Sequence, residues 1–170
     1  MRVFPIAVSA AFAVAIVASA GQSQKPDDQI DQRSMALTKQ AQGLTVAGRY
    51  SEAIDTLETA LAVDPRNRDA YIGLAKVALA QKLPGKAIKL YGEALALEPN
   101  DINALSGQGA ALVERGAVER AKQNLTRIKG LCKGSCTQAT TLAAVIAKGP
   151  PPQVVTAARV PETIPDKGEN

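Results

Sequence analysis

The segments ALAVDP, residues 60–65, and ALALEP, residues 94–99, are near copies of each other that lie 34 residues apart. Sliding residues 34–67 over residues 68–101 aligns eight identical residues, most of them alanine. A third stretch that begins at Ile102 keeps Ala104, Gly107 and Ala121 in the same register. A period of this length is typical of a chain built from repeated supersecondary units that stack on one another.

Each copy has the pattern of two amphipathic helices. In the second copy Tyr71, Leu74 and Ala78 recur at helical spacing, and the half from Pro84 to Leu97 repeats the pattern. Small residues such as Ala87 allow two helix backbones to approach closely, and large residues fill the space beside them. No strand-like alternation of polar and apolar residues is present in the sequence.

The predicted helices have recognisable ends. Pro65 and Pro99 should stop the second helix of each copy, because proline cannot continue the hydrogen-bond ladder. Asn67 and Asp101 are then placed to cap the helix that follows. Pro84 suits a first helical turn, where its missing N–H costs nothing.

These features resemble the tetratricopeptide repeat family, whose 34-residue pattern is W-x2-L-G-x2-Y, then A-x3-F, then P. The second copy matches this pattern at Tyr71, Leu74, Ala75, Ala87, Tyr91 and Pro99. The third copy departs from it, because Ile128 replaces a small residue and Lys133 replaces the closing proline. The resemblance covers about residues 34 to 133 and implies an all-α, right-handed solenoid of about three helix-turn-helix repeats followed by a capping helix.

We therefore divide the chain into a terminal segment at each end and one repeat domain. The predicted parts are a signal peptide at 1–20, a flexible leader at 21–33, a repeat domain at 34–148 with repeats 34–67, 68–101 and 102–133 and a capping helix at 137–148, and a disordered proline-rich tail at 149–170. Five prolines in the tail prevent it from packing a core and favour extended, solvated conformations.

The N-terminus has the order of a secretory signal peptide. Arg2 is a short positive region, residues 3–17 carry no charge, and Ala18-Ser19-Ala20 is a small-x-small site that places the cut before Gly21. The alternative is an uncleaved membrane anchor, which needs about 20 strongly apolar residues. We predict export across the inner membrane, with the periplasm of a Gram-negative bacterium as the destination. No integral membrane segment is then expected in the mature chain.

Composition argues against nucleic-acid binding and against catalysis. The formal charge of +4 falls to +3 when Arg2 is removed, and the sequence shows no dense cluster of lysine and arginine with aromatic platforms. The chain contains no histidine, no glycine-rich phosphate loop after a strand and no nucleophile with a partner base. We expect a protein that is not an enzyme and needs no cofactor.

Cys132 and Cys136 are the only cysteines. In an oxidising compartment paired cysteines usually form a disulfide, which here would close a five-residue loop and end the third repeat. Two alternatives stay open. The pair could hold copper(I), because soft sulfur ligands suit that ion, or it could exchange thiols, which needs one exposed cysteine with a lowered pKa. Structural zinc is not expected, because it takes four ligands.

The resemblance also implies a binding groove lined by the first helix of each repeat. The register places nine residues there: Thr38, Gln42, Thr45, Ile72, Lys76, Leu79, Ser106, Ala110 and Val113. Family members that clamp the carboxylates of chaperone tails use Lys, Arg and Asn on this face. The matching positions here are Thr38, Gln42, Gly73, Asn103 and Gly107, so acidic C-terminal tails are poor candidate ligands.

The sequence as a whole predicts an exported scaffold that binds a peptide or protein segment and helps to assemble a cell-envelope complex. The competing hypothesis is a periplasmic thiol-redox or copper-handling protein that uses Cys132 and Cys136.

Overall fold

The computed structural model describes residues 29–132, 134 and 136–152. These residues contain no strand and form α1 (Gln32–Val46), α2 (Tyr50–Val63), α3 (Arg68–Ala80), α4 (Pro84–Leu97), α5 (Ile102–Glu114), α6 (Val118–Leu131) and α7 (Thr137–Lys148). The predicted signal peptide, its cleavage site between Ala20 and Gly21, most of the leader and most of the tail lie outside the described residues.

The helix ends are set by capping side chains and prolines. The side chains of Asn67 and Asp101 cap α3 and α5, as predicted, by accepting hydrogen bonds from backbone N–H groups of the first turn. Pro84 lies in the first turn of α4, and α2 and α4 both end in extended backbone just before the predicted prolines. The first helix begins at Gln32 with Asp31 as its cap, slightly before the expected repeat start at residue 34.

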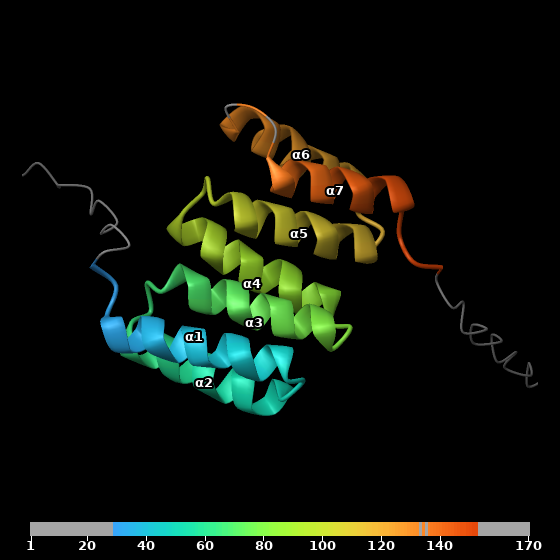
Figure 1. Cartoon of the computed structure of the whole chain (residues 1–170). Helices are drawn as coiled ribbons and strands as arrows, with labels where there is room; N and C mark the ends of the chain where they lie inside the picture. Colours follow the sequence, from blue (N-terminus) through green and yellow to red (C-terminus); the bar gives the residue numbers. More distant parts are fainter. Residues whose placement is uncertain (1–28, 133, 135, 153–170) are drawn as a thin grey trace, which may run out of the picture.

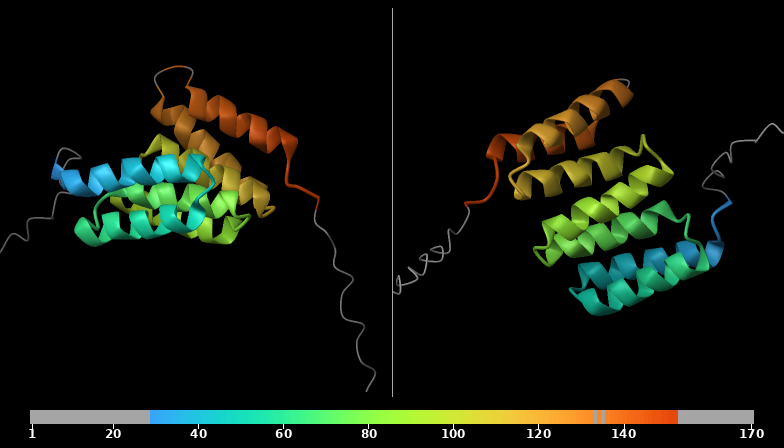
Figure 2. Two further views of the ribbon diagram at one scale, coloured as in Figure 1. Left: turned by 60° about the horizontal axis from the view of Figure 1, so that its bottom comes forward. Right: turned by 180° about the vertical axis from the view of Figure 1, so that it is seen from behind.

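The helices form three antiparallel pairs that stack in chain order (Figure 1). The first helices pack in sequence, with α1 on α3, α3 on α5, and α5 on α7, while α7 also packs on α6. Two further views show that α2, α4 and α6 lie on the side of the stack away from α1, α3 and α5 (Figure 2). The prediction of an all-α solenoid of helix pairs with a capping helix is confirmed.

Alanine and glycine form the close seams between helices. Ten alanines in the described helices have no exposed surface, namely Ala41, Ala53, Ala60, Ala70, Ala75, Ala87, Ala94, Ala104, Ala111 and Ala121. Large side chains lie against glycines of neighbouring helices: Tyr91 of α4 against Gly107 of α5, and Leu142 of α7 against Gly109 of α5. A Cβ added to Gly109 would be 2.6 Å from Cδ2 of Leu142, which is shorter than a contact distance, so α7 can dock on α5 only because this position is glycine.

Buried polar groups connect the first repeat to the second. The Asn67 side-chain amide donates to Ser34 Oγ at 2.7 Å and to Thr38 Oγ1 at 3.0 Å, and Ser34 Oγ donates to the carbonyl of Ala60 at 2.7 Å. All three side chains are buried, and each is hydrogen-bonded. Asn67 therefore caps α3 and ties it to α1 with one side chain.

A carboxylate beside this network ties the start of α1 to the end of α2. Asp64 accepts from the backbone N–H of Asp31 at 3.0 Å and pairs with Arg66 at 2.9 Å. Side-chain hydrogen bonds from Arg66 hold the pKa of Asp64 at about 2, although burial alone would raise it. Because the folded-state pKa lies below the unfolded value, this carboxylate stabilises the fold above the unfolded pKa, and the contribution is lost as the pH falls toward 2.

The side chains of α6 explain why the outer layer ends there. Ile54 and Leu61 of α2 pack against the next repeat, and Leu95 of α4 does the same in the cluster around α5 and α6. Two 34-residue periods after Ile54 and Leu61, and one period after Leu95, the corresponding residues of α6 are Lys122 and Lys129. Both lysines are exposed. Terminal repeats of a solenoid need such a polar outer surface, since no further helix covers it.

Candidate binding site on the inner face

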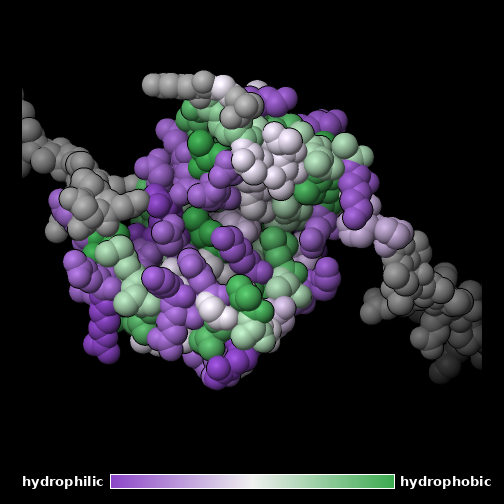
Figure 3. Space-filling view, in the orientation of Figure 1, coloured by the Kyte–Doolittle hydropathy of each residue, from purple (hydrophilic) through white to green (hydrophobic). Residues whose placement is uncertain are grey.

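We call the face formed by α1, α3, α5 and α7 the inner face. Figure 1 looks onto it, and the space-filling view in the same orientation shows hydrophobic side chains interspersed with hydrophilic ones (Figure 3). All nine residues predicted to line a groove belong to α1, α3 and α5. Their exposure separates them into residues that a partner can reach and residues that belong to the core.

Three of the nine predicted groove residues are buried. Thr38 is 4% exposed and forms part of the network around Asn67. Ile72 is 6% exposed and packs in the cluster that joins α3 to α4 and α5. Val113 is 1% exposed because Val145 and Ile146 of α7 cover it. These three side chains pack mainly against neighbouring helices and offer little surface, so a partner contact at them stays a prediction.

The other six predicted residues are at least partly accessible. Gln42 and Lys76 are exposed, whereas Thr45, Leu79, Ser106 and Ala110 are half-buried. The structure brings three of them together around one pocket, whose lining residues are Gln42, Thr45, Val46, Leu57, Gly73 and Lys76. Leu79 packs beside the core cluster of α3 and α4, and Ser106 donates to the carbonyl of Gln138 in α7 at 3.3 Å.

The pocket between α1 and α3 has a volume of about 270 Å³ and an apolar floor. Leu57 of α2 reaches the floor from behind, because Gly73 leaves room for it: a Cβ at Gly73 would lie 2.8 Å from Leu57 Cδ2. Val46, at the end of α1, is 90% exposed and so presents an apolar side chain at the rim of the pocket. Lys76 is the single charged residue among the described residues that line this pocket.

Sequence reasoning missed Val46, Leu57 and Gly73. An apolar residue at an exposed helix end could have pointed to Val46. Leu57 occupies the second-helix position that the repeat pattern assigns to the core, so the sequence held no sign that it also reaches the inner face.

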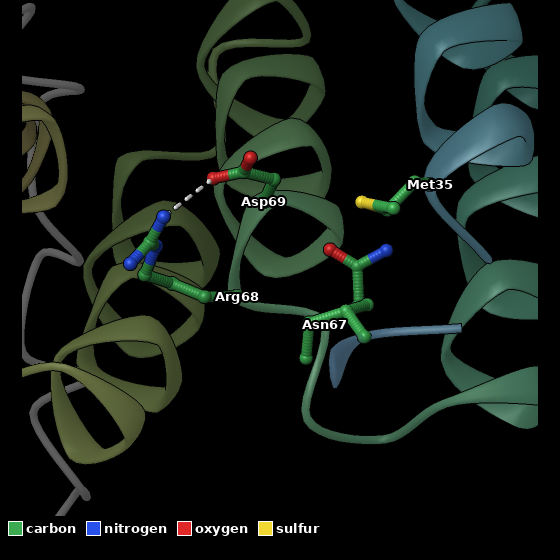
Figure 4. Close-up of a pocket in the computed structure, with 5 residues that line it drawn as sticks. Met35, Asn67, Arg68 and Asp69 are labelled. Atoms are coloured by element: carbon green, nitrogen blue, oxygen red, sulfur yellow. Dashed lines mark hydrogen bonds and ion pairs between the residues drawn. The ribbon is translucent and has the colours of Figure 1, made fainter. Parts of the chain in front are cut away.

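A smaller pocket lies beside the start of α3 and has a structural explanation (Figure 4). Its volume is about 40 Å³, and Ile30, Met35, Asn67, Arg68 and Asp69 line it. Arg68 turns toward Asp69, 3.5 Å away, and forms an ion pair with Asp101 at 2.8 Å. The polar groups here are engaged in holding α3 to its neighbours, and the space is large enough for water only.

No three histidine, cysteine, aspartate or glutamate side chains within residues 29–132, 134 and 136–152 lie close enough to hold a metal ion. None of the helices in the same residues has the length and apolar character needed to cross a bilayer.

The two cysteines are paired at the junction between α6 and α7. Their sulfur atoms are bonded at 2.13 Å, with Cys132 at the C-cap of α6 and Cys136 at the N-cap of α7. Both side chains are half-buried and pack on the cluster formed by Leu105, Ile128 and Leu142. The bond therefore anchors the start of α7 next to the residues on which α7 docks.

Replacing Cys132 and Cys136 with serine should loosen α7 more than the helices before it. Closing a loop of this size removes unfolded-state entropy worth roughly 2 kcal/mol, which corresponds to about 30-fold faster hydrogen exchange in α7. Residues 34 to 100 should change little, because stability in stacked repeats is passed between nearest neighbours. Hydrogen exchange measured by mass spectrometry checks this, and equal loss of protection in every helix, or none in α7, would contradict it.

With the geometry established, comparison with known proteins identifies the fold. A model of the tetratricopeptide repeat matches residues 38–102. The first such domain of Spaghetti (RPAP3), solved with the HSP90 peptide SRMEEVD, is 26% identical over 70% of this chain and 94% of its own, with a TM-score of 0.63. No curated protein matches the chain significantly.

Two further solved structures show the same fold at lower identity. The second repeat domain of human RPAP3, in complex with the HSP70 peptide SGPTIEEVD, is 23% identical over 68% of this chain and 95% of its own, with a TM-score of 0.61. The Sgt2 domain from Aspergillus fumigatus is 22% identical over 77% of this chain and 93% of its own, with a TM-score of 0.62. The helix pairs described above therefore have the tetratricopeptide-repeat fold.

Proposed function

We propose that this protein is an exported, non-enzymatic scaffold that binds a peptide or protein segment at the α1–α3 pocket of its inner face. The observation that carries the proposal is this pocket, in which the exposed Val46 lies near one unpaired lysine, Lys76, and two polar side chains, with the buried Leu57 behind the floor. The role we propose for the scaffold is the assembly of a cell-envelope complex in the periplasm of a Gram-negative bacterium.

The chemistry of the pocket suits a short segment in an extended conformation. Covering Val46 would remove apolar surface from water, which contributes roughly 25 cal/mol per Å². Lys76 can pair with a carboxylate, and Gln42 can donate to or accept from a peptide backbone. Among the described residues Lys76 forms no ion pair, so no internal partner must be displaced when a ligand binds.

Similar solved structures support a binding role and also limit it. Two of them hold the chaperone peptides SRMEEVD and SGPTIEEVD. In this chain the positions that would match a carboxylate clamp carry no cation: Thr38 is buried, Gly107 lies against Tyr91, and Asn103 accepts from Gln138. We therefore propose an internal segment of a partner as the ligand, in preference to a free C-terminal tail.

Two sequence features support export. Residues 1–20 have the order of a signal peptide, and Ala18-Ser19-Ala20 provides the cleavage site. The paired sulfurs of Cys132 and Cys136 fit an oxidising compartment. The same pairing favours the scaffold over a thiol or copper carrier, because a carrier needs thiolates that are free to react or to bind the ion.

Capture of the partner in intact cells tests this proposal. A photo-crosslinking residue placed at Gln42, in the pocket, should trap one predominant protein in a saturable manner. The same residue placed at Lys89, on the outer helix α4, should not trap it. Equal capture at both positions, or capture at Lys89 alone, would show that the binding surface lies elsewhere.

The same preparation tests export through its intact mass. The captured chain should begin at Gly21, as the cleavage site predicts. A native chain that retains Met1 to Ala20 would mean that the N-terminal segment is an anchor, and the proposed localisation would then need revision.

A further inference from the structure

We infer that the inner face holds a second ligand subsite between α5 and α7, which binds an apolar side chain and an adjacent carboxylate of the same partner segment. The inference rests on the proposed function and specifies its ligand: one extended segment with two apolar–acidic units, one for each pocket. The residues of this second subsite come from α5, α7, the turn after α3 and the first prolines of the tail.

The second pocket has a volume of about 560 Å³, within the range of ligand sites in proteins. Its lining residues are Lys82, Val113, Glu114, Val145, Lys148, Gly149, Pro150, Pro151 and Pro152. Val145, which is half-buried, supplies the accessible apolar side chain over the buried Val113, and the prolines form a wall. Proline has a fixed φ and no backbone N–H, so this wall is stiff and presents carbonyl groups only.

The capping helix is therefore part of the site as well as part of the fold. Leu142 docks α7 on Gly109 of α5, and this contact places Val145 beside Val113. Gly149 then ends α7 with φ +75°, a conformation that suits glycine, and sends the prolines past the pocket. Loss of α7 from α5 would remove Val145, Lys148 and the proline wall together.

The charges of this pocket fit an acidic ligand. Lys82 and Lys148 outnumber Glu114 among its lining residues. Within the described part of the chain none of these three side chains forms an ion pair, so both lysines are available to a carboxylate. A ligand with a carboxylate next to an apolar side chain would suit a pocket that holds two lysines together with valine and proline side chains.

The two pockets occupy equivalent places in the repeat array. Thr45 and Val46 of the first pocket correspond, two 34-residue periods later, to Val113 and Glu114 of the second. Both pockets therefore lie at the C-terminal ends of first helices, along one edge of the inner face. A single extended segment could leave the first pocket beside Lys76 of α3 and follow this edge to the second pocket.

A random 16-residue peptide library displayed on phage, selected on the mature, disulfide-bonded protein, tests the inference. We expect enriched peptides to carry two apolar–acidic units. Lys148→Glu and Lys82→Glu should each weaken their binding at least tenfold, while Lys89→Glu on the outer helix α4 leaves it unchanged. Lys76→Glu should also weaken the binding of these peptides. The binding of peptides with a single apolar–acidic unit should depend on Lys76 alone.

The outcomes separate the inference from the proposed function. Peptides that respond to Lys76→Glu but not to Lys148→Glu or Lys82→Glu would overturn the second subsite and leave the first pocket in place. No enriched peptide, or peptides indifferent to Lys76→Glu and Lys148→Glu, would contradict the proposed function and the inference together. Peptides whose binding is weakened only by Lys148→Glu and Lys82→Glu would support the second subsite and overturn the first.

Discussion

Replacing Tyr91 with alanine should lower the free energy of unfolding by about 3–5 kcal/mol, the cost typical of truncating a buried aromatic residue. Tyr91 is 2% exposed, and its ring fills the seam between α4 and α5 at a point where Gly107 has no side chain. Burial also raises the pKa of the Tyr91 hydroxyl to about 12. Neither helix can close the space that the ring leaves, because both are held at their other contacts.

Urea unfolding followed by circular dichroism measures this effect. Since the total stability of a domain is only about 5–15 kcal/mol, the Tyr91→Ala variant should be partly unfolded without denaturant if the wild type lies at the low end. Tyr91→Phe keeps the ring and should lower the free energy of unfolding by less than about 1.5 kcal/mol. Tyr71→Ala, at a half-buried position, provides a second control. A loss below about 1 kcal/mol for Tyr91→Ala would mean that the α4–α5 seam is not packed as described.

Replacing Lys76 with glutamate should weaken partner binding by at least about 30-fold, which corresponds to roughly 2 kcal/mol. Reversing this charge puts a carboxylate where we place a carboxylate of the ligand, and like charges in contact repel. The free protein should change in stability by less than about 0.5 kcal/mol, because Lys76 is exposed.

Two variants make the Lys76→Glu result interpretable. Lys89→Glu makes the same charge change on α4 and should leave binding intact. Ala87→Glu forces a charge into a position with no exposed surface, so binding should fall only together with helix content. Titration of the captured partner by calorimetry, with circular dichroism of each variant, checks all three. Unchanged affinity in Lys76→Glu would show that the partner does not bind at the α1–α3 pocket.

The sequence was sufficient to predict the fold because the determinants of the helix pairs are local and repeated. The prolines at 65 and 99 stop two helices, Asn67 and Asp101 cap the helices that follow, and alanines recur at the seams. Each feature acts within a few residues, and the 34-residue period shows which copies are equivalent. In the third repeat, Lys122 and Lys129 replace the apolar residues of the earlier copies, and this replacement marks the end of the outer layer.

The candidate binding site was harder to predict because it depends on contacts between distant segments. Helical periodicity placed Val113 on the inner face, but only the docking of α7 shows that Val145 and Ile146 cover it. Thr38 has a suitable register and is nevertheless bound by the amide of Asn67, 29 residues away. Leu57 enters the pocket from the second layer, which a repeat pattern assigns entirely to the core.

Hydrogen exchange of the protein with and without its captured partner tests the central claim most directly. The claim is that one face, formed by the first helices, binds the partner. We expect slower exchange on binding in segments 42–46 and 73–80, which contain every lining residue of the α1–α3 pocket except the buried Leu57, with α2, α4 and α6 unchanged. Protection confined to α2, α4 and α6, or absent from both inner segments, would contradict the claim.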